Sequence, residues 1–161
     1  MFLGPAIFQQ VVEATPLVSI DLVVRDAKGR VLLGLRRNRP AREFWFVPGG
    51  RVLKNERLDE AFLRLTFDEL GRPLMRSSAT PLGVFEHIYL DSIFGENIGT
   101  HYVVLGYLID LPEGVSLVPP AAQHQEYRWV SPAQAEDDLS IHQYTRDYFA
   151  VLPSRSSLQE C

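Results

Sequence analysis

The chain has 161 residues, of which 46% are hydrophobic and 22% charged, and its formal net charge is −4. This composition is typical of a globular protein and excludes intrinsically disordered and collagen-like chains. The negative balance argues against nonspecific binding to nucleic acids or acidic membranes, but it leaves room for a local basic pocket that holds a small phosphorylated ligand.

The sequence predicts a single domain over residues 1–161, because no linker, repeat or low-complexity stretch divides it. Its only cysteine is Cys161, so an internal disulfide is impossible, and a reducing, cytoplasmic location is expected. No apolar run reaches the roughly 18–20 residues of a membrane span, and residues 1–8 lack the features of a secretion signal. We therefore expect no membrane association.

Strands are predicted in several parts of the chain. A β-branched run at 17–25, a turn signal at 26–30 and an apolar run at 31–35 together predict a hairpin. A short aromatic strand is expected over 44–48, ending at two glycines. Further strands are expected at 82–90, 102–111 and 127–130.

The clearest helix is predicted over Glu56–Leu70. Asn55 is its expected N-cap, since an Asn side chain can accept a first-turn N–H, and Gly71 should end it. Two more helices are expected, one opening at Ser131 and one over 142–152. These elements predict an α+β fold with a mixed β-sheet between helices.

One carboxylate of the central helix points toward the expected core. At about 100° per residue, Glu69 falls within the apolar stripe that contains Leu58, Phe62 and Leu65. A carboxylate in a core costs several kcal/mol unless it is neutralised, paired or bound to metal. Two explanations therefore stay open: either the last turn reaches water or a base such as Arg64, or Glu69 binds a cation.

The residues around this helix favour the cation. Gly49 and Gly50 place flexible backbone before it, Arg51 follows, and the preceding hairpin carries further arginines, including Arg36. Mg²⁺ prefers oxygen ligands and is often shared with substrate phosphates, whose oxygens arginines also bind. A lone carboxylate, a glycine carbonyl and arginines are the components of a Mg²⁺–diphosphate site.

These residues form a known pattern. The run Gly50-x5-Glu56-x7-Arg64-Leu-Thr-Phe-Asp68-Glu69-Leu-Gly71 resembles the Nudix box, G-x5-E-x7-R-E-U-x-E-E-x-G-U. The sequence departs from it at Leu65, where the family has a catalytic glutamate, at Asp68, where the first of two paired glutamates stands, and at Arg72. Because leucine cannot bind metal or move a proton, the altered box predicts either an inactive protein or gentler chemistry with fewer ions.

The altered segment Arg64-Leu65-Thr66 resembles one branch of the family, the GDP-mannose mannosyl hydrolases, and the similarity extends over segments 15–19, 38–40, 45–51, 100–106, 123–124 and 127–129. This resemblance implies a Nudix-type α/β/α sandwich. It also implies hydrolysis of GDP-mannose, and of GDP-glucose as well, by water attack at the anomeric carbon with inversion. One Mg²⁺ per subunit, or Mn²⁺ in its place, would hold the diphosphate leaving group.

The same resemblance implies roles for individual residues. The metal ligands would be the Gly49 carbonyl, the Glu69 carboxylate and the Gln123 side-chain oxygen, all of them oxygen donors. His124 would be the general base, since an imidazole can accept a proton from water at neutral pH. Arg64 would bridge to Glu56 and orient Glu69.

The substrate contacts implied by the resemblance lie elsewhere in the chain. Arg36 and Arg51, together with Tyr102, would hold the phosphates and stabilise the departing charge. The N-terminal segment 1–16 would contact the nucleotide through Phe2, Leu3 and Phe8, in a homodimer. The partner of the chain would thus be a GDP-hexose, with neither nucleic acid nor membrane involved.

Three polar residues in apolar strands each allow two interpretations. Asp21 either caps a neighbouring loop or binds sugar hydroxyls. His87 and His101 flank the segment 91–100, and each is either a strand-end hydrogen-bonding residue or part of the site. Asp21 and His87 are the two that we place in substrate binding.

Two rival functions follow from the same residues. One is a Nudix hydrolase that cleaves a P–O bond of a nucleoside diphosphate derivative, and Leu65 argues against it. The other is a non-catalytic nucleotide-sugar sensor, and His124 beside Gln123 argues against that, since a sensor needs no base.

Overall fold

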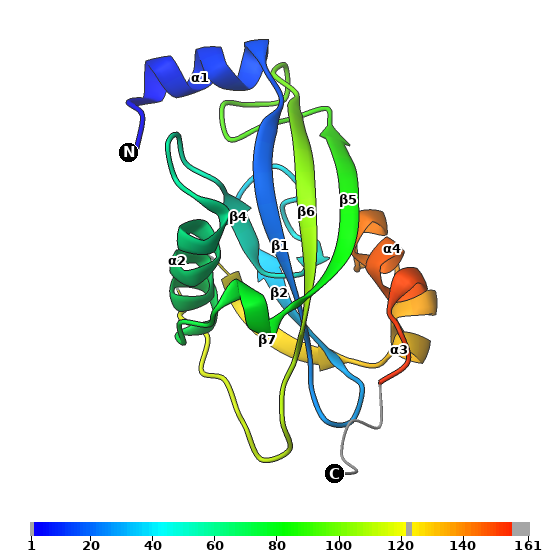
Figure 1. The fold of residues 1–161 in the computed structure, drawn as a ribbon. Coiled ribbons are helices and arrows are strands. Elements are labelled where there is room, and N and C mark those ends of the chain that lie inside the picture. Colours follow the sequence, from blue (N-terminus) through cyan, green and yellow to red (C-terminus); the bar gives the residue numbers. More distant parts are fainter. Residues whose placement is uncertain (1, 122–123, 156–161) are drawn as a thin grey trace.

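The computed structural model describes residues 2–121 and 124–155, with the backbone alone at Gln125. In these residues a mixed β-sheet lies between helix α2 (Leu58–Leu70) on one face and helices α3 (Pro132–Asp137) and α4 (Gln143–Val151) on the other (Figure 1). Helix α1 (Pro5–Ala14) lies at one end of the sheet, and a short 3-10 helix (Arg76–Ser78) follows α2. The predicted α+β sandwich with a mixed sheet is confirmed.

Seven strands form the described sheet: β1 (Leu17–Arg25), β2 (Val31–Arg36), β3 (Trp45–Phe46), β4 (Gly49–Arg51), β5 (Thr80–Tyr89), β6 (Thr100–Asp110) and β7 (His124–Val130). Their order is β3-β2-β1-β6-β5, while β4 pairs with β1 and β7 pairs with β2. The central pair β1–β6 is parallel, and the other pairings are antiparallel.

The predicted hairpin forms, but its strands soon separate. β1 and β2 are in register at Arg25 and Val31, next to the turn. Beyond that point β1 pairs with β4 through residues 19–21, and β2 pairs with β3 and β7. Because the strands diverge, the short glycine strand β4 lies between them, where the candidate site is found.

Two apolar cores lie on opposite faces of the sheet. On β1, Leu22 and Val24 pack with Phe62 of α2, whereas Val23 packs on the other face with Tyr148 of α4. Burial on both faces explains why neighbouring positions of β1, such as 22–24, are all apolar rather than alternating with polar residues. In the described residues, no helix has the length and apolarity that crossing a bilayer requires.

The start of α2 differs from the prediction in two ways: the helix begins at Leu58 rather than Glu56, and Asn55 is not its N-cap. The residue that precedes the helix is Arg57, whose backbone N–H donates to the Glu60 side chain at 3.0 Å. Asn55 instead adopts a left-handed conformation with φ of 67°, which Asn tolerates better than most residues, and it therefore shapes the turn before the helix. At the other end Gly71 takes φ of 70° and ends the helix as predicted.

Helix α1 was not among the predicted elements. It opens at Pro5, a residue favoured in the first helical turn, and it buries little, with Val12 its one buried residue. Figure 1 shows it lying across the end of β1 and β6, above the loop that joins β4 to α2. This position brings its N-terminal half toward the candidate site.

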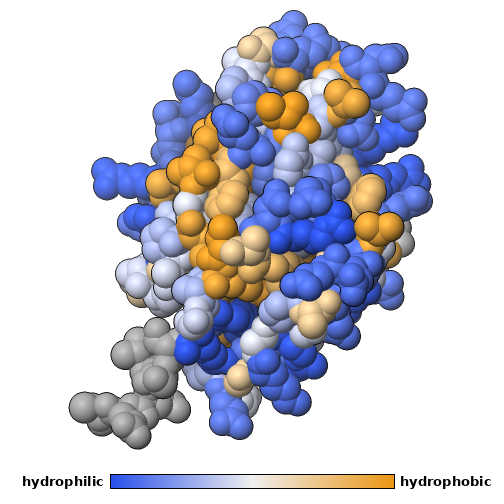
Figure 2. Space-filling model, turned by 90° about the vertical axis from the view of Figure 1, so that its right-hand side faces the viewer, coloured by the Kyte–Doolittle hydropathy of each residue, from blue (hydrophilic) through white to orange (hydrophobic). Residues whose placement is uncertain are grey.

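Strand β5 forms an edge of the sheet and carries exposed apolar side chains. Val84 and Ile88 are 67% and 58% exposed, and Leu90 just beyond the strand is 90% exposed. Figure 2, which views the molecule from the side of β5 and α4, shows apolar side chains gathered in a band along this face.

Candidate active site

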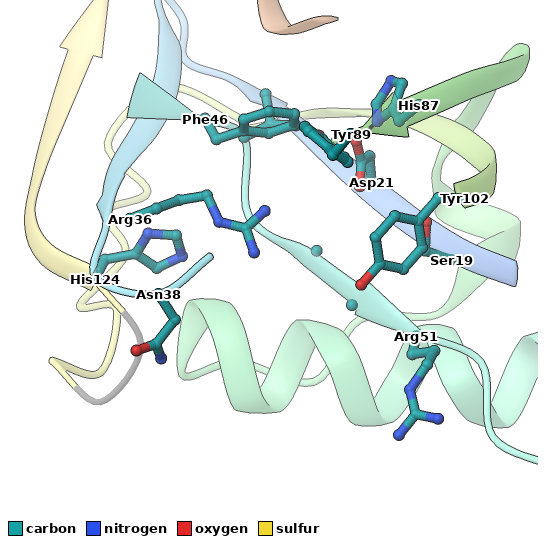
Figure 3. A pocket seen from close by; sticks show the side chains of 13 residues that line it. Ser19, Asp21, Arg36, Asn38, Phe46, Arg51, His87, Tyr89, Tyr102 and His124 are labelled. Carbon is teal, nitrogen blue, oxygen red and sulfur yellow. Dashed lines mark ion pairs between the residues drawn. The ribbon is translucent and has the colours of Figure 1, made fainter. Parts of the chain in front are cut away.

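One pocket gathers most of the residues to which the sequence pointed. It lies between the diverging strands and encloses about 660 Å³, counting its open mouth. Seven predicted site residues line it: Asp21, Arg36, Gly49, Arg51, His87, Tyr102 and His124. In Figure 3 the Arg36 guanidinium points into its centre, His124 and Asn38 lie at one end, and Asp21 and His87 lie at the other.

Glu69 is buried beside this pocket. Its side chain is 2% exposed, and in the described part of the chain its Oε2 atom has no hydrogen-bond partner. The nearest basic atom is His124 Nε2, at 3.5 Å. Because an uncompensated buried carboxylate is costly, this oxygen fits a bound cation. The alternative that Glu69 reaches water is therefore wrong, and Arg64 pairs with Glu56 instead, so the base near Glu69 is His124.

The described residues include two of the three predicted metal ligands. Among residues 2–121 and 124–155, no group of three or more His, Cys, Asp or Glu side chains is arranged to hold a metal. The predicted set contains one such side chain, Glu69, together with a backbone carbonyl at Gly49 and an amide at Gln123. Gln123 lies outside the described residues.

Arg64 braces the loop before α2. It donates to both carboxylate oxygens of Glu56, at 2.6 and 2.9 Å, and to the Arg51 carbonyl at 2.9 Å. The same ion pair lowers the pKa of Glu56. The predicted bridge from Arg64 to Glu56 therefore forms, and it fixes the backbone of Arg51 at the pocket. Exposed Asp68 lies 3.8 Å from Arg64 and points away from the buried Glu69.

His124 begins strand β7 and is buried at 6% exposure. Its ring lies directly over Gly34 of β2: an ideal Cβ on that glycine would come within 2.4 Å of His124 Nδ1. On its other side the ring lies 5.2 Å from the ring of Tyr127, whose hydroxyl donates to the Pro120 carbonyl at 2.9 Å. Thus the bare backbone of Gly34 and the anchored Tyr127 set the position of the imidazole.

Two arginines reach the pocket from different strands. Arg36 ends β2, and its guanidinium lies 5.6 Å from the centre of the Phe46 ring. Arg51 ends β4 and stacks on Phe8 of α1 at 4.0 Å. Burial lowers the pKa of Arg51, yet an arginine stays cationic at neutral pH. Two cations that line one pocket of a chain with negative net charge suit phosphate oxygens chemically.

The opposite end of the pocket holds Asp21 and His87. Burial raises the pKa of Asp21 to about 6, although the Tyr148 hydroxyl donates to it at 2.6 Å. Burial also lowers the pKa of His87 to about 4. His87 is therefore neutral at physiological pH, and its Nδ1, 4.0 Å from Asp21 Oδ2, makes no ion pair there. This end offers a carboxylate and a neutral imidazole, which suits hydroxyl groups.

The remaining predicted residues lie at different distances from the pocket. Phe8 contacts it through Arg51 and also packs edge-on against Phe94, with 5.6 Å between the ring centres. Phe2 is 81% exposed, and Leu3 is partly buried. His101 lines a separate shallow depression near the end of α1. The structure does not bring His101 to the site.

Several lining residues were missed by sequence reasoning. Ser19, Asn38 and Tyr89 line the pocket. Phe46, in the predicted aromatic strand, lines the pocket as well, and at 3% exposure it also belongs to the core. Asn38 had a usable signal, since it lies between Arg36 and the aromatic strand. Tyr89 had no such signal, because the alternation of apolar and polar residues in a strand does not distinguish a residue that lines a pocket from one in the core.

Comparison with known proteins agrees with this geometry. The family model described as the NUDIX domain matches residues 15–151. A curated relative from Haloferax volcanii, the "Low-salt glycan biosynthesis protein Agl8", is 38% identical over 146 residues, which cover 90% of this chain and 87% of that protein.

Solved structures are similar as well. The MutT NUDIX hydrolase from Burkholderia pseudomallei is 28% identical with a TM-score of 0.67, over 86% of this chain and 99% of that one. The MutT protein from Methanosarcina mazei Go1 shares the fold at 22% identity and a TM-score of 0.68, over 85% of this chain and 93% of that one.

Proposed function

The chain belongs to the NUDIX domain family, and on that premise we propose that it hydrolyses GDP-mannose, and GDP-glucose as well, to GDP and the free sugar. As a Nudix hydrolase it acts on a nucleoside diphosphate derivative. The finer proposal, a sugar nucleotide cleaved at its anomeric carbon, draws support from the sequence resemblance and from the glycan-related name of the Haloferax volcanii relative.

One observation carries this proposal. Leu65 stands where the family's catalytic glutamate is expected, and it is buried at 3% exposure against Gly50, where an ideal Cβ would lie 2.5 Å from Leu65 Cδ2. An apolar side chain thus occupies that corner beside the glycines, and Glu69 is the buried carboxylate that α2 contributes. A site with fewer carboxylates suits the departure of a good leaving group, GDP, better than attack on phosphorus.

Nudix hydrolases generally use a divalent metal such as Mg²⁺ or Mn²⁺. Here Glu69 and the Gly49 carbonyl would hold one ion, with Gln123 as the third proposed ligand. When bound, such an ion neutralises charge on the diphosphate and so stabilises it as a leaving group. Among the described residues the buried Oε2 of Glu69 has no hydrogen-bond partner, which supports this assignment.

The residues of the chain would share the remaining work. Arg36 and Arg51 would bind the phosphate oxygens from two sides, and Tyr102 would orient them. His124 would take a proton from the attacking water, and its Nε2 is 3.5 Å from the proposed metal ligand Glu69, so base and leaving group share one site. At the other end, Asp21 and His87 would bind hydroxyls of the hexose.

The decisive experiment is hydrolysis of GDP-mannose with Mg²⁺ in ¹⁸O water. We expect GDP and free mannose, with the label in the sugar. Label in phosphate, with mannose-1-phosphate and GMP as products, would instead support P–O cleavage. Mg²⁺-dependent binding without turnover would support the sensor. The variant His124→Gln should turn over about 10²–10⁴-fold more slowly, and an unchanged rate would remove His124 from the mechanism.

We also propose that the chain is one Nudix domain that works as a homodimer in the cytoplasm. The exposed apolar side chains of edge strand β5, Val84 and Ile88, support association, because such edges are normally covered or charged. The single cysteine supports a reducing compartment. Light scattering of the purified protein tests the dimer, and a monomer with full activity would contradict it.

A further inference from the structure

Helix α4 reaches the back of the pocket with a buried tyrosine. The Tyr148 side chain is fully buried, and its hydroxyl lies 2.6 Å from Asp21 Oδ2. Burial and the neighbouring carboxylate raise the pKa of Tyr148, so the hydroxyl keeps its proton and is the donor. One carboxylate oxygen of Asp21, Oδ2, therefore accepts a hydrogen bond from α4. The other, Oδ1, lies along Gly49 in the pocket wall, where an ideal Cβ on that glycine would be 2.7 Å away.

A glycine gives the tyrosine its path to Asp21. Gly106 of β6 is the register partner of Asp21 on the neighbouring strand. A Cβ there would lie 3.2 Å from Tyr148 Cε1 and 2.9 Å from Phe85 Cε2. The Phe85 ring in turn packs edge-on against Tyr148, with 4.8 Å between their centres. The Tyr148 ring thus lies against bare backbone, and its packing leaves it little freedom.

A second tyrosine of α4 holds the imidazole. The Tyr144 ring stacks on His87 with 4.3 Å between centres and 5° between planes. Its hydroxyl accepts from the Ile88 N–H at 3.0 Å and donates to the Ile88 carbonyl at 2.9 Å, in place of a neighbouring strand at the edge of β5. Both ends of Tyr144 are therefore fixed, and so is the plane of the His87 ring.

We infer that Tyr148 and Tyr144 are positioning residues for the sugar end of the site: they orient Asp21 and His87 so that one carboxylate oxygen and one fixed imidazole face the ligand's hydroxyls. The inference rests on the proposed function, because it takes the hydroxyl-bearing part of the ligand to lie against Asp21. It makes α4, which contributes no residue to the pocket lining, a determinant of selectivity for a sugar nucleotide over the bare nucleotide.

The test compares the affinities of the protein for two ligands, with and without the Tyr148 hydroxyl. In a His124→Gln background, which slows turnover, the affinities for GDP-mannose and for GDP are measured by calorimetry with Mg²⁺. Adding Tyr148→Phe, which removes one hydroxyl and keeps the ring, should lower the affinity for GDP-mannose about tenfold and change the affinity for GDP less than about twofold. Tyr107→Phe is the matched control, because Tyr107 is also a buried tyrosine with a hydrogen-bonded hydroxyl, 3.1 Å from Arg76 Nη1 and facing the other core.

A second variant covers the case in which Tyr148→Phe fails to fold. Tyr144→Phe loses only the hydroxyl at the sheet edge. It should lower the affinity for GDP-mannose about threefold to tenfold, again without changing the affinity for GDP. Equal loss for both ligands, or no loss in a folded variant, would overturn the inference, as would a parent protein that binds GDP-mannose no better than GDP. Sugar-dependent binding without release of mannose would defeat the proposed function alone.

Discussion

Gly34→Ala tests whether the backbone of β2 sets the position of the proposed base. Gly34 lies beneath His124, and a Cβ built on it would be 2.4, 2.5 and 2.9 Å from Nδ1, Cγ and Cε1 of the ring. Ordinary contacts between such atoms begin near about 3.5 Å. The alanine methyl therefore requires the imidazole to move by about 1 Å, because the strand that carries Gly34 is hydrogen-bonded on both sides.

The size of the effect follows from this displacement. A misplacement of about 1 Å at a reacting group costs on the order of 10²-fold in rate, equivalent to about 2.7 kcal/mol. We therefore expect Gly34→Ala to lower kcat for GDP-mannose about 100-fold. Stability should change little, because alanine favours a strand over glycine by about 0.5–1 kcal/mol and offsets part of the steric cost.

The assay is a double-mutant cycle with His124→Ala, with kcat measured at saturating Mg²⁺ and substrate. Once the ring is gone, Gly34→Ala should have almost no further effect, so the two losses are strongly non-additive. Wild-type kcat in Gly34→Ala, or fully additive losses in the cycle, would refute the reasoning. Thermal denaturation of each variant distinguishes a displaced ring from an unfolded protein.

Three further predictions address other parts of the site. Glu69→Gln should raise the Mg²⁺ concentration needed for half-maximal activity and, with a chelator present, raise Tm by a few degrees, since it replaces a buried carboxylate whose Oε2 has no hydrogen-bond partner among the described residues; an unchanged metal requirement would make Glu69 structural. Phe8→Leu should weaken GDP binding up to about tenfold through loss of the stack on Arg51, measured by calorimetry with exposed Phe67→Leu as the control. Because the pKa of His87 is lowered to about 4, the unfolded chain takes up a proton between about pH 6.5 and 4 that the folded chain does not, and stability falls as pH drops through this window. His87→Gln should therefore lose less stability than wild type between pH 7 and 4.5, by roughly 2 kcal/mol in chemical denaturation, and equal losses would contradict the shifted pKa.

Local sequence patterns predicted those parts of the fold that depend on neighbouring residues in the chain. The run 17–25 became β1 with the predicted bounds, and Gly71 ended α2. Helical periodicity placed Glu69 on the apolar stripe of α2, but it left open whether the last turn reaches water. Helix α1 was missed, although Ile7, Phe8, Val11 and Val12 recur at helical spacing; the run is short, and only Val12 is buried.

The sequence predicted only those site residues that belong to a recognisable motif. Arg36, Arg51 and His124 lie near glycines or in a recognisable pattern, and they meet in one pocket. Tyr148 and Asp21 are 127 positions apart in the sequence, and nothing local in either segment indicates their contact. Such a pairing depends on sheet register and on Gly106, which come from the tertiary structure.

The parallel pairing of β1 with β6 has a consequence for how the protein is made. Residues 17–25 pair with residues 102–110, so the two middle strands of the sheet come from segments about 85 positions apart. Contacts of such long sequence separation are slow to form, since a long stretch of chain must be closed first. During synthesis the β6 side of β1 therefore stays unpaired until β6 has left the ribosome, and a nascent chain that stops short of residue 100 exposes that side of the strand.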